Sequence, residues 1–188
     1  MGDTRDPART KAALLDAALV EFSAHGRAGA RTSAIARRAG VNKQLISHHF
    51  GGKDGLYRAL VERWEAEEER YGGPDVSLAE LAGRYVEDGA RHRDLHRLLL
   101  RASLDDQEAG GGVGADDLDD LRRRQDAGEL TRRLDPAFVL LALEAIASAP
   151  LVFPADVRRL TGRDPASDDF AVWHAAQLRT LVELLAER

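Results

Sequence analysis

Histidines and lysines stand out among the residues of this sequence that could do chemistry. His48 and His49 are adjacent, His92 and His96 are four residues apart, and Lys53 follows two glycines. Imidazoles are common metal ligands, and a lysine near a helix start can hold a phosphate. The chain contains no cysteine, which excludes disulfides, zinc–thiolate sites and a cysteine nucleophile.

The spacing of these histidines does not favour a metal site. Neighbouring residues on a helix point about 100° apart, so His48 and His49 do not converge on one ion. His92 and His96 have a spacing compatible with metal binding, but "HRDLH" lacks the glutamate of the H-E-x-x-H motif. We therefore predict no metal, no cofactor and no catalytic residue. The run Arg122–Arg124 is interpreted as a solvated face, with the wall of a site for an acidic effector as the alternative.

Composition indicates an all-α protein. The 188 residues are 44% hydrophobic, 31% charged and only 5% aromatic. Alanine, leucine and arginine abound, and these residues favour helices over strands. No apolar run reaches the ~18 residues of a membrane helix, and the first residues lack the apolar stretch of a signal peptide. We expect a cytoplasmic protein that does not contact a membrane.

Charge is distributed unevenly along the chain. Residues 1–63 contain 11 Lys and Arg against 6 Asp and Glu, whereas residues 64–188 contain 16 against 26. The first part therefore has a net charge of +5 and the rest −10. A basic head on an acidic body suits a polyanion as partner, although charge alone does not decide this.

Cap residues and hydrophobic periodicity divide the chain into helices. Asp6-Pro7 begins the first helix, which Gly26 ends. Thr32 is expected to cap a second helix that ends at Gly40, and Asn42 a third that spans 43–50. Further helices are expected from Lys53 onward, at about 77–89, 92–106 and 115–127, at 136–149 after the cap Asp135, and after Ser167 or Asp168. "QEAGGGVGADD" predicts a surface loop.

The stretch "AGVNKQLISHHF" has the pattern of a helix-turn-helix. Gly40 permits a sharp turn, and apolar residues at 35, 41, 46 and 50 can pin the two helices together. This arrangement leaves an acid-free face that suits the negative potential of a DNA groove, made of Lys43, Gln44, Leu45, Ser47 and His48. Lys53 and the free N–H groups at the start of the next helix would suit a phosphate.

From about residue 10 to residue 64 the chain resembles the DNA-binding domain of TetR-family transcriptional regulators. "AIARRAGVNKQLISHHF" is similar to the family core I-A-x-x-A-G-V-S-x-x-x-[LI]-x-x-x-F, with Asn42 for the usual Ser, and "GGKDGLY" to the following x-x-K-x-x-L. Leu45 and Ser47 replace a frequent Thr and Tyr, so the operator sequence does not carry over. The resemblance implies DNA contacts by Thr32, Asn42, Lys43, Gln44, Leu45, Ser47, His48, His49 and Lys53.

The resemblance also implies the organisation of the whole protein. A three-helix helix-turn-helix domain would span residues 1–53, and a helical effector-binding and dimerisation domain residues 54–188. A homodimer would bind a palindromic operator on double-stranded DNA, most simply as a repressor released by a small-molecule effector. Expected dimer contacts are Leu141, Leu143, Ala147, Trp173, Leu178 and Leu181. Expected effector contacts are Trp64, Tyr85, His92, His96 and Arg101.

Two rival functions remain open at this level. The first is an all-α enzyme or small-molecule carrier with an incidental basic head. The second is a DNA-binding architectural protein or activator that responds to no small effector. Salt-dependent binding of duplex DNA separates the first rival from a regulator, because affinity dominated by phosphate contacts falls steeply with salt.

Overall fold

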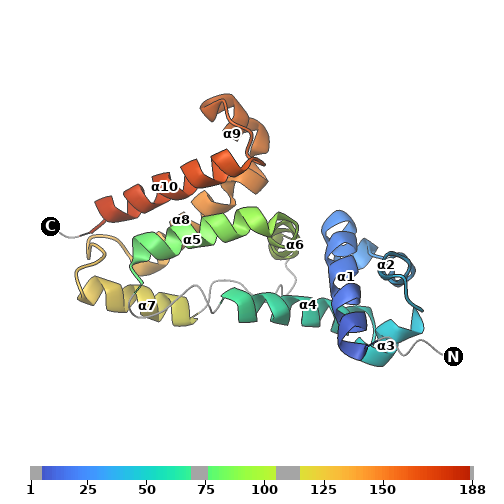
Figure 1. The fold of residues 1–188 in the computed structure, drawn as a ribbon. Coiled ribbons are helices and arrows are strands. Elements are labelled where there is room, and N and C mark those ends of the chain that lie inside the picture. The colour runs from blue at the N-terminus through green and yellow to red at the C-terminus, as the bar shows by residue number, and fades with distance from the viewer. Residues whose placement is uncertain (1–5, 69–75, 105–114, 187–188) are drawn as a thin grey trace. The chain divides into compact units, whose positions relative to one another are not determined.

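The computed structural model describes residues 6–68, 76–104 and 115–186, and within these ranges it contains helices and no strand (Figure 1). This confirms the all-α prediction. The helices are α1 (Pro7–Gly29), α2 (Thr32–Ala39), α3 (Gln44–Phe50), α4 (Lys53–Glu68), α5 (Leu78–Arg91), α6 (Arg93–Leu104), α7 (Ala115–Asp126), α8 (Pro136–Val152), α9 (Pro154–Thr161) and α10 (Asp168–Leu184). Most of the predicted glycine-rich loop lies outside the described residues.

The chain forms two compact units. The first comprises Met1–Glu68 with Asp94–Gly112, and the second comprises Glu69–Arg93 with Val113–Arg188. Helix α4 and most of α6 therefore belong to the same compact unit as α1, α2 and α3. The functional boundary expected between residues 53 and 54 stays a prediction.

The predicted helix starts are confirmed where a side chain caps them. The carboxylate of Asp6 accepts a hydrogen bond from the N–H of Ala8 at 2.9 Å, and that of Asp135 accepts one from Ala137 at 2.7 Å. The Ser167 hydroxyl accepts one from Phe170 at 3.2 Å. Each bond satisfies an N–H that the first turn of a helix leaves without a partner.

One predicted helix end is correct in part and another was wrong. Gly26 adopts a non-helical conformation with φ 67°, but it kinks α1, which resumes and continues to Gly29. Pro150 lies inside α8. Its ring nitrogen cannot donate to the carbonyl of Ile146, four residues earlier. The buried His174 of α10 hydrogen-bonds to that carbonyl instead. The carbonyl that the proline leaves without a helical donor thus has a partner far away in sequence.

The core of the first unit joins the three N-terminal helices to α4 and α6. Phe22, Ile35 and Ile46 are fully or almost fully buried, together with Leu60 of α4 and Leu98 of α6. A polar contact adds to this packing, since the Ser23 hydroxyl lies 2.7 Å from the carbonyl oxygen of Asp94. The first turn of α6 is thus held directly against α1.

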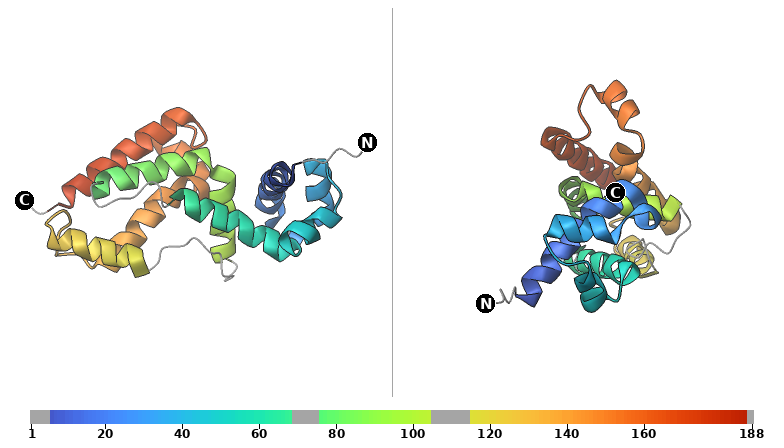
Figure 2. Two further views of the ribbon diagram at one scale, coloured as in Figure 1. Left: turned by 60° about the horizontal axis from the view of Figure 1, so that its bottom comes forward. Right: turned by 90° about the vertical axis from the view of Figure 1, so that its right-hand side faces the viewer.

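The second unit is centred on α5 and α10, which lie side by side (Figures 1 and 2). Their buried faces meet through apolar residues that include Val86 and Leu178. Gly83 leaves room for the Arg179 guanidinium, which pairs with Glu80 at 3.0 Å and Glu87 at 2.9 Å. These ion pairs join α5 and α10 at the side of the apolar contact.

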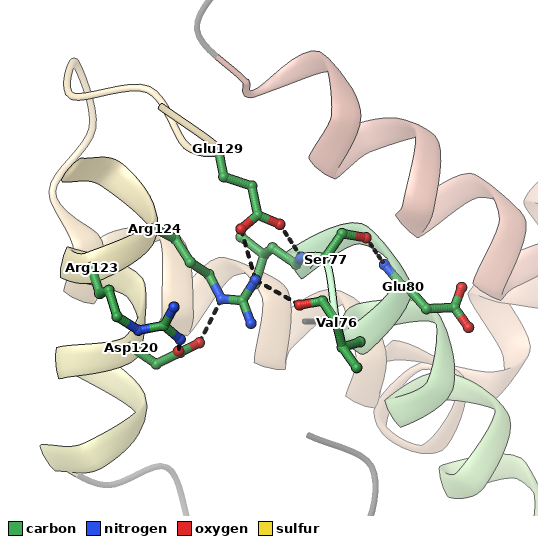
Figure 3. A network of polar contacts seen from close by, with 8 residues as sticks. Val76, Ser77, Glu80, Asp120, Arg123, Arg124 and Glu129 are labelled. Carbon is green, nitrogen blue, oxygen red and sulfur yellow. Dashed lines mark hydrogen bonds and ion pairs between the residues drawn. The ribbon is translucent and has the colours of Figure 1, made fainter. Parts of the chain in front are cut away.

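The interpretation of Arg122–Arg124 as a solvated face is wrong for Arg124, whose side chain is only 3% exposed (Figure 3). Its guanidinium donates to Asp120 at 2.6 Å, to Glu129 at 2.8 Å and to the carbonyl of Val76 at 2.9 Å. Three acceptors compensate for burial of this charge. Arg124 therefore links α7 to the start of α5. Arg122 and Arg123 are exposed, as predicted.

Among the described residues, no single helix is both long and apolar enough to cross a membrane. In the described part of the chain, one bent pair, α8 with α9, reaches the required length and composition, and the two helices meet at an angle of 92°.

Candidate nucleic-acid interface

The turn between α2 and α3 has the geometry that the sequence predicted. Gly40 ends α2 in the left-handed conformation with φ 66°, where a side chain would be strained. The N–H of Val41 donates to the carbonyl of Ala36 at 3.0 Å, which closes the turn. Ile35 and Ile46 are buried on either side of it. The relative placement of the two helices is thus determined by apolar packing and one tight turn.

Asn42 begins the third helix as predicted. Its side-chain oxygen accepts a hydrogen bond from the N–H of Gln44 at 2.8 Å. The regular helix begins at Gln44 rather than at Lys43, whose backbone is already helical. The short α3 therefore has a defined start although it spans only a few residues.

The outer face of α3 and the turn before it carries polar and basic side chains and no acid. Asn42, Lys43, Gln44, Ser47 and His48 are exposed, and His49 is half-buried. A short helix with this composition can approach the negatively charged groove of DNA without repulsion, and its amide and hydroxyl groups can bond to base edges.

Leu45 lies elsewhere than the sequence suggested. It is half-buried and packs against the core of the first unit, together with Val41 and Phe50. Only part of its side chain is left to contact a base. The prediction that Leu45 faces outward is therefore wrong in part, because apolar residues flank it on both sides of the turn.

Thr32 does not cap α2. The cap position is taken by Arg31, whose backbone is extended and whose side chain forms no capping bond. The carbonyl of Arg31 accepts from Ala34 at 2.9 Å, and its N–H donates to the carboxylate of Glu21 at 3.2 Å. Thr32 is the first residue of the helix and is half-buried. Its role at the DNA stays a prediction.

Lys53 begins α4, and its ammonium group is already engaged. It donates to the carbonyl of Ala28 at 3.1 Å and to that of Ala30 at 3.4 Å, at the connection between α1 and α2. An ammonium has three hydrogens, so one remains for a phosphate. Lys53 thus has a structural role that the sequence did not suggest, beside the phosphate contact that stays a prediction.

The two adjacent histidines of α3 touch each other, with ring centroids 4.9 Å apart. Burial lowers the pKa of His49 below its ordinary value of 6.5, and the charges of His48 and Lys11 lower it further. His49 is therefore protonated only at a lower pH than an ordinary histidine. No group of three or more His, Cys, Asp or Glu that could hold a metal ion occurs in residues 6–68, 76–104 and 115–186.

Comparison with known proteins supports this interface. Residues 14–60 match the family model of bacterial regulatory proteins, tetR family, and residues 77–188 match that of the tetracyclin repressor-like C-terminal domain. The HTH-type transcriptional repressor SCO4008 of Streptomyces coelicolor is 31% identical over 88% of this chain and 90% of its own length. The chain belongs to the tetR family of regulatory proteins.

Two further relatives extend the comparison. The crystal structure of the transcriptional regulator SCO4942 from Streptomyces coelicolor matches with a TM-score of 0.78 and 30% identity, over 95% of this chain and 99% of that one. The A-factor receptor protein of Streptomyces griseus is 30% identical over 68% of this chain and 49% of its own length.

Three exposed cations on α1 and α2 of this tetR-family regulator were not among the predicted DNA contacts. Arg37 and Arg38 are exposed on α2, and Lys11 of α1 lies close enough to His49 to influence its charge. The arginines could have been found from helical periodicity, since they lie opposite the buried pair Ile35 and Ala36. No local pattern placed Lys11 near α3, because the two are far apart in sequence.

The five expected effector residues of the regulator fall into both units. In the first unit, the Trp64 ring meets the His96 ring edge-on at 5.6 Å, and Arg101 lies 3.4 Å from the carbonyl of Ala24. In the second, the Tyr85 hydroxyl lies 3.3 Å from a carboxylate oxygen of Glu144, and His92 lies 3.4 Å from Asp88. Trp64 and His96 are thus brought together, and the effector role of all five stays a prediction.

Proposed function

We propose that this tetR-family regulator is a cytoplasmic repressor that binds a palindromic operator as a homodimer and releases it when a small molecule binds. The observation that carries the proposal is the acid-free outer face of α3, held on a fully packed helix-turn-helix. A basic first part and an acidic remainder support it, because they direct DNA to the N-terminal unit. No catalytic function is proposed.

The dimer proposal rests on exposed apolar side chains of α8 and α10. Leu141 is 69% exposed on α8, and Val172 and Leu184 are exposed to a similar extent on α10. Large exposed apolar patches mark interaction sites. Two helices from each of two chains would cover these side chains in a four-helix interface.

The six expected dimer contacts differ in exposure. Leu141 and Leu181 are exposed and remain candidates. Leu143 and Ala147 are half-buried against the core of the second unit, and Trp173 is half-buried as well. Leu178 is only 2% exposed and belongs to that core, so its assignment to the interface was wrong.

Release by an effector needs only unequal affinity for two states. A ligand that prefers the DNA-incompetent state by about 100-fold supplies about 2.7 kcal/mol against operator binding. Its relatives support such control, since one is named a repressor and another a receptor for A-factor.

DNA binding is tested by selecting genomic fragments on the purified protein and measuring their affinity at several salt concentrations. We expect the logarithm of the affinity to fall linearly with the logarithm of the salt concentration, with a slope of about −0.9 per phosphate contact. Lys43→Ala should weaken binding, whereas Arg122→Ala, which removes an exposed cation from the second unit, should not. Absence of any salt-dependent complex would reject the regulator and favour the carrier.

The dimer is tested by sedimentation at micromolar concentration. Leu141→Glu should shift the protein to monomer and weaken operator binding. Leu104→Glu is the matched control, because Leu104 of α6 is 77% exposed and lies in the first unit. A monomeric wild type would reject the palindromic arrangement.

A further inference from the structure

Two buried donors of α4 have no hydrogen-bond acceptor among the residues that the structure describes. They are the hydroxyl group of Tyr57 and the indole N–H of Trp64, whose residues are only 4% and 3% exposed. Buried polar groups are almost always bonded, because leaving one without a partner is unfavourable. These two atoms therefore require an explanation.

Both donors lie on one face of the helix. Residues seven apart are separated by almost two full turns, so their side chains point within about 20° of each other and lie about 10 Å apart along the axis. Leu60 and Val61 lie between them and are buried. This face of α4 is therefore apolar, with one hydrogen-bond donor toward each end.

Both donor side chains pack edge-on against an aromatic ring. The Tyr57 ring meets Phe22 edge-on at 5.4 Å, and the Trp64 ring meets His96 at 5.6 Å. Arg27 lies over the Tyr57 ring, but its charge is paired with Asp54 at 3.1 Å. Burial raises the pKa of Tyr57, which keeps its hydroxyl protonated and able to donate.

We propose that Tyr57 and Trp64 recognise an uncharged effector whose hydrogen-bond-accepting oxygens, such as carbonyl groups, are carried on an apolar skeleton. This inference rests on the effector control proposed above and names the chemical class of the effector. A carbonyl oxygen can accept from either donor without the large desolvation cost of an ion. An ammonium ligand would lose its hydration and gain at most one acceptor, the Tyr57 hydroxyl oxygen, because the indole N–H only donates.

The position of the two donors also explains how such a ligand would affect α3, the helix proposed to contact DNA. Tyr57 packs on Phe22 of α1, and α4 begins at Lys53, directly after α3. A ligand that accepts from Tyr57 and Trp64 must enter between α4 and its neighbours in the first unit. It would displace α4 and therefore change the placement of α3.

Stability alone gives the first test. Tyr57→Phe removes a hydroxyl that makes no bond, so Tm should stay the same or rise. Tyr85→Phe is the matched control, because it removes a hydroxyl that is bonded to Glu144, and Tm should fall. An equal fall of Tm in both variants would show that Tyr57 has a partner within the folded protein and would overturn the proposal.

Binding of three probes with similar alkyl chains gives the second test, with undecan-2-one as the neutral acceptor, decylammonium as the cation and decanoate as the anion. In a Trp173→Phe background Trp64 is the only tryptophan, and its fluorescence reports binding. We expect the ketone to bind about tenfold more tightly than either ion. Tyr57→Phe should weaken the ketone about five- to tenfold, the value of one hydrogen bond.

The outcomes separate this inference from the function on which it rests. Ketone binding that is absent throughout the soluble range of the ketone, or unchanged by Tyr57→Phe, overturns the inference. So does an ion that binds as tightly as the ketone. Failure of the wild-type protein to bind any DNA would instead reject the proposed function.

Discussion

Adding a single methyl group at Gly55 of α4 should displace α3, the reading helix, whose outer face is proposed to contact DNA. A Cβ at this position would lie 2.9 Å from the carbonyl carbon of Phe50 and closer still to its oxygen. Both atoms belong to the backbone at the end of α3, so no side-chain rotation can relieve the overlap. Gly55→Ala must therefore move α3 and α4 apart.

Two opposing effects determine the magnitude. Alanine is better than glycine inside a helix by about 1 kcal/mol. Overpacking a closely packed contact costs about 1–3 kcal/mol and occasionally more, and a backbone overlap lies at the upper end of that range. We expect Gly55→Ala to lower the free energy of unfolding by about 2 kcal/mol, which lowers Tm by about 4–8 °C in a protein of this size.

The assay combines thermal unfolding with operator affinity. Gly29→Ala is the matched control, since its Cβ would lie 3.4 Å from the Cβ of His25, close to an ordinary contact. The control should be as stable as the wild type or slightly more stable, with unchanged affinity. Gly55→Ala should lose more than about tenfold in specific affinity even at temperatures where it is folded. If both variants behave alike, the close approach of α3 to Gly55 does not position the reading helix.

Four further changes test particular contacts. Lys53→Ala should lower both Tm and the affinity for all DNA, and reduce the salt slope by about one unit, because the ammonium would hold two carbonyls and a phosphate. Leu45→Ala should destabilise the protein by about 1–3 kcal/mol and affect base preference less, because Leu45 packs on the core. Glu144→Gln should raise Tm at pH 7, since burial raises the pKa of Glu144 and disfavours its charged form. This gain should shrink as the pH falls through that raised pKa toward 4.5. His174→Phe should destabilise the protein by about 1–2 kcal/mol, and less so when Pro150→Ala restores the bond to the carbonyl of Ile146.

For each of these four predictions, one result would contradict it. An unchanged salt slope in Lys53→Ala would show that Lys53 does not contact a DNA phosphate. A changed base preference with unchanged Tm would show that Leu45 contacts DNA bases rather than the core. A stability gain of Glu144→Gln that is independent of pH would show that charge is not its cause. Additive effects at His174 and Pro150 would show that the two residues do not share one carbonyl.

The sequence alone predicted the features that depend on neighbours along the chain. The caps Asp6, Asn42, Asp135 and Ser167 bond to N–H groups two or three residues later, so the residue types themselves determine them. The buried positions of the helix-turn-helix follow from the helical period and a glycine turn. Together these local signals also indicated the family.

Tertiary structure alone decided the roles that depend on distant residues. The two carbonyls that accept hydrogen bonds from Lys53 lie more than 20 residues earlier in the sequence. The buried Arg124 donates to a carbonyl 48 residues away. Pro150 leaves the carbonyl of Ile146 without its helical donor, and His174, which interacts with that carbonyl, comes from another helix. Periodicity states which face of a helix is apolar, but it does not state what that face meets. A side chain's environment is determined by elements brought together from across the chain, and only folding places them.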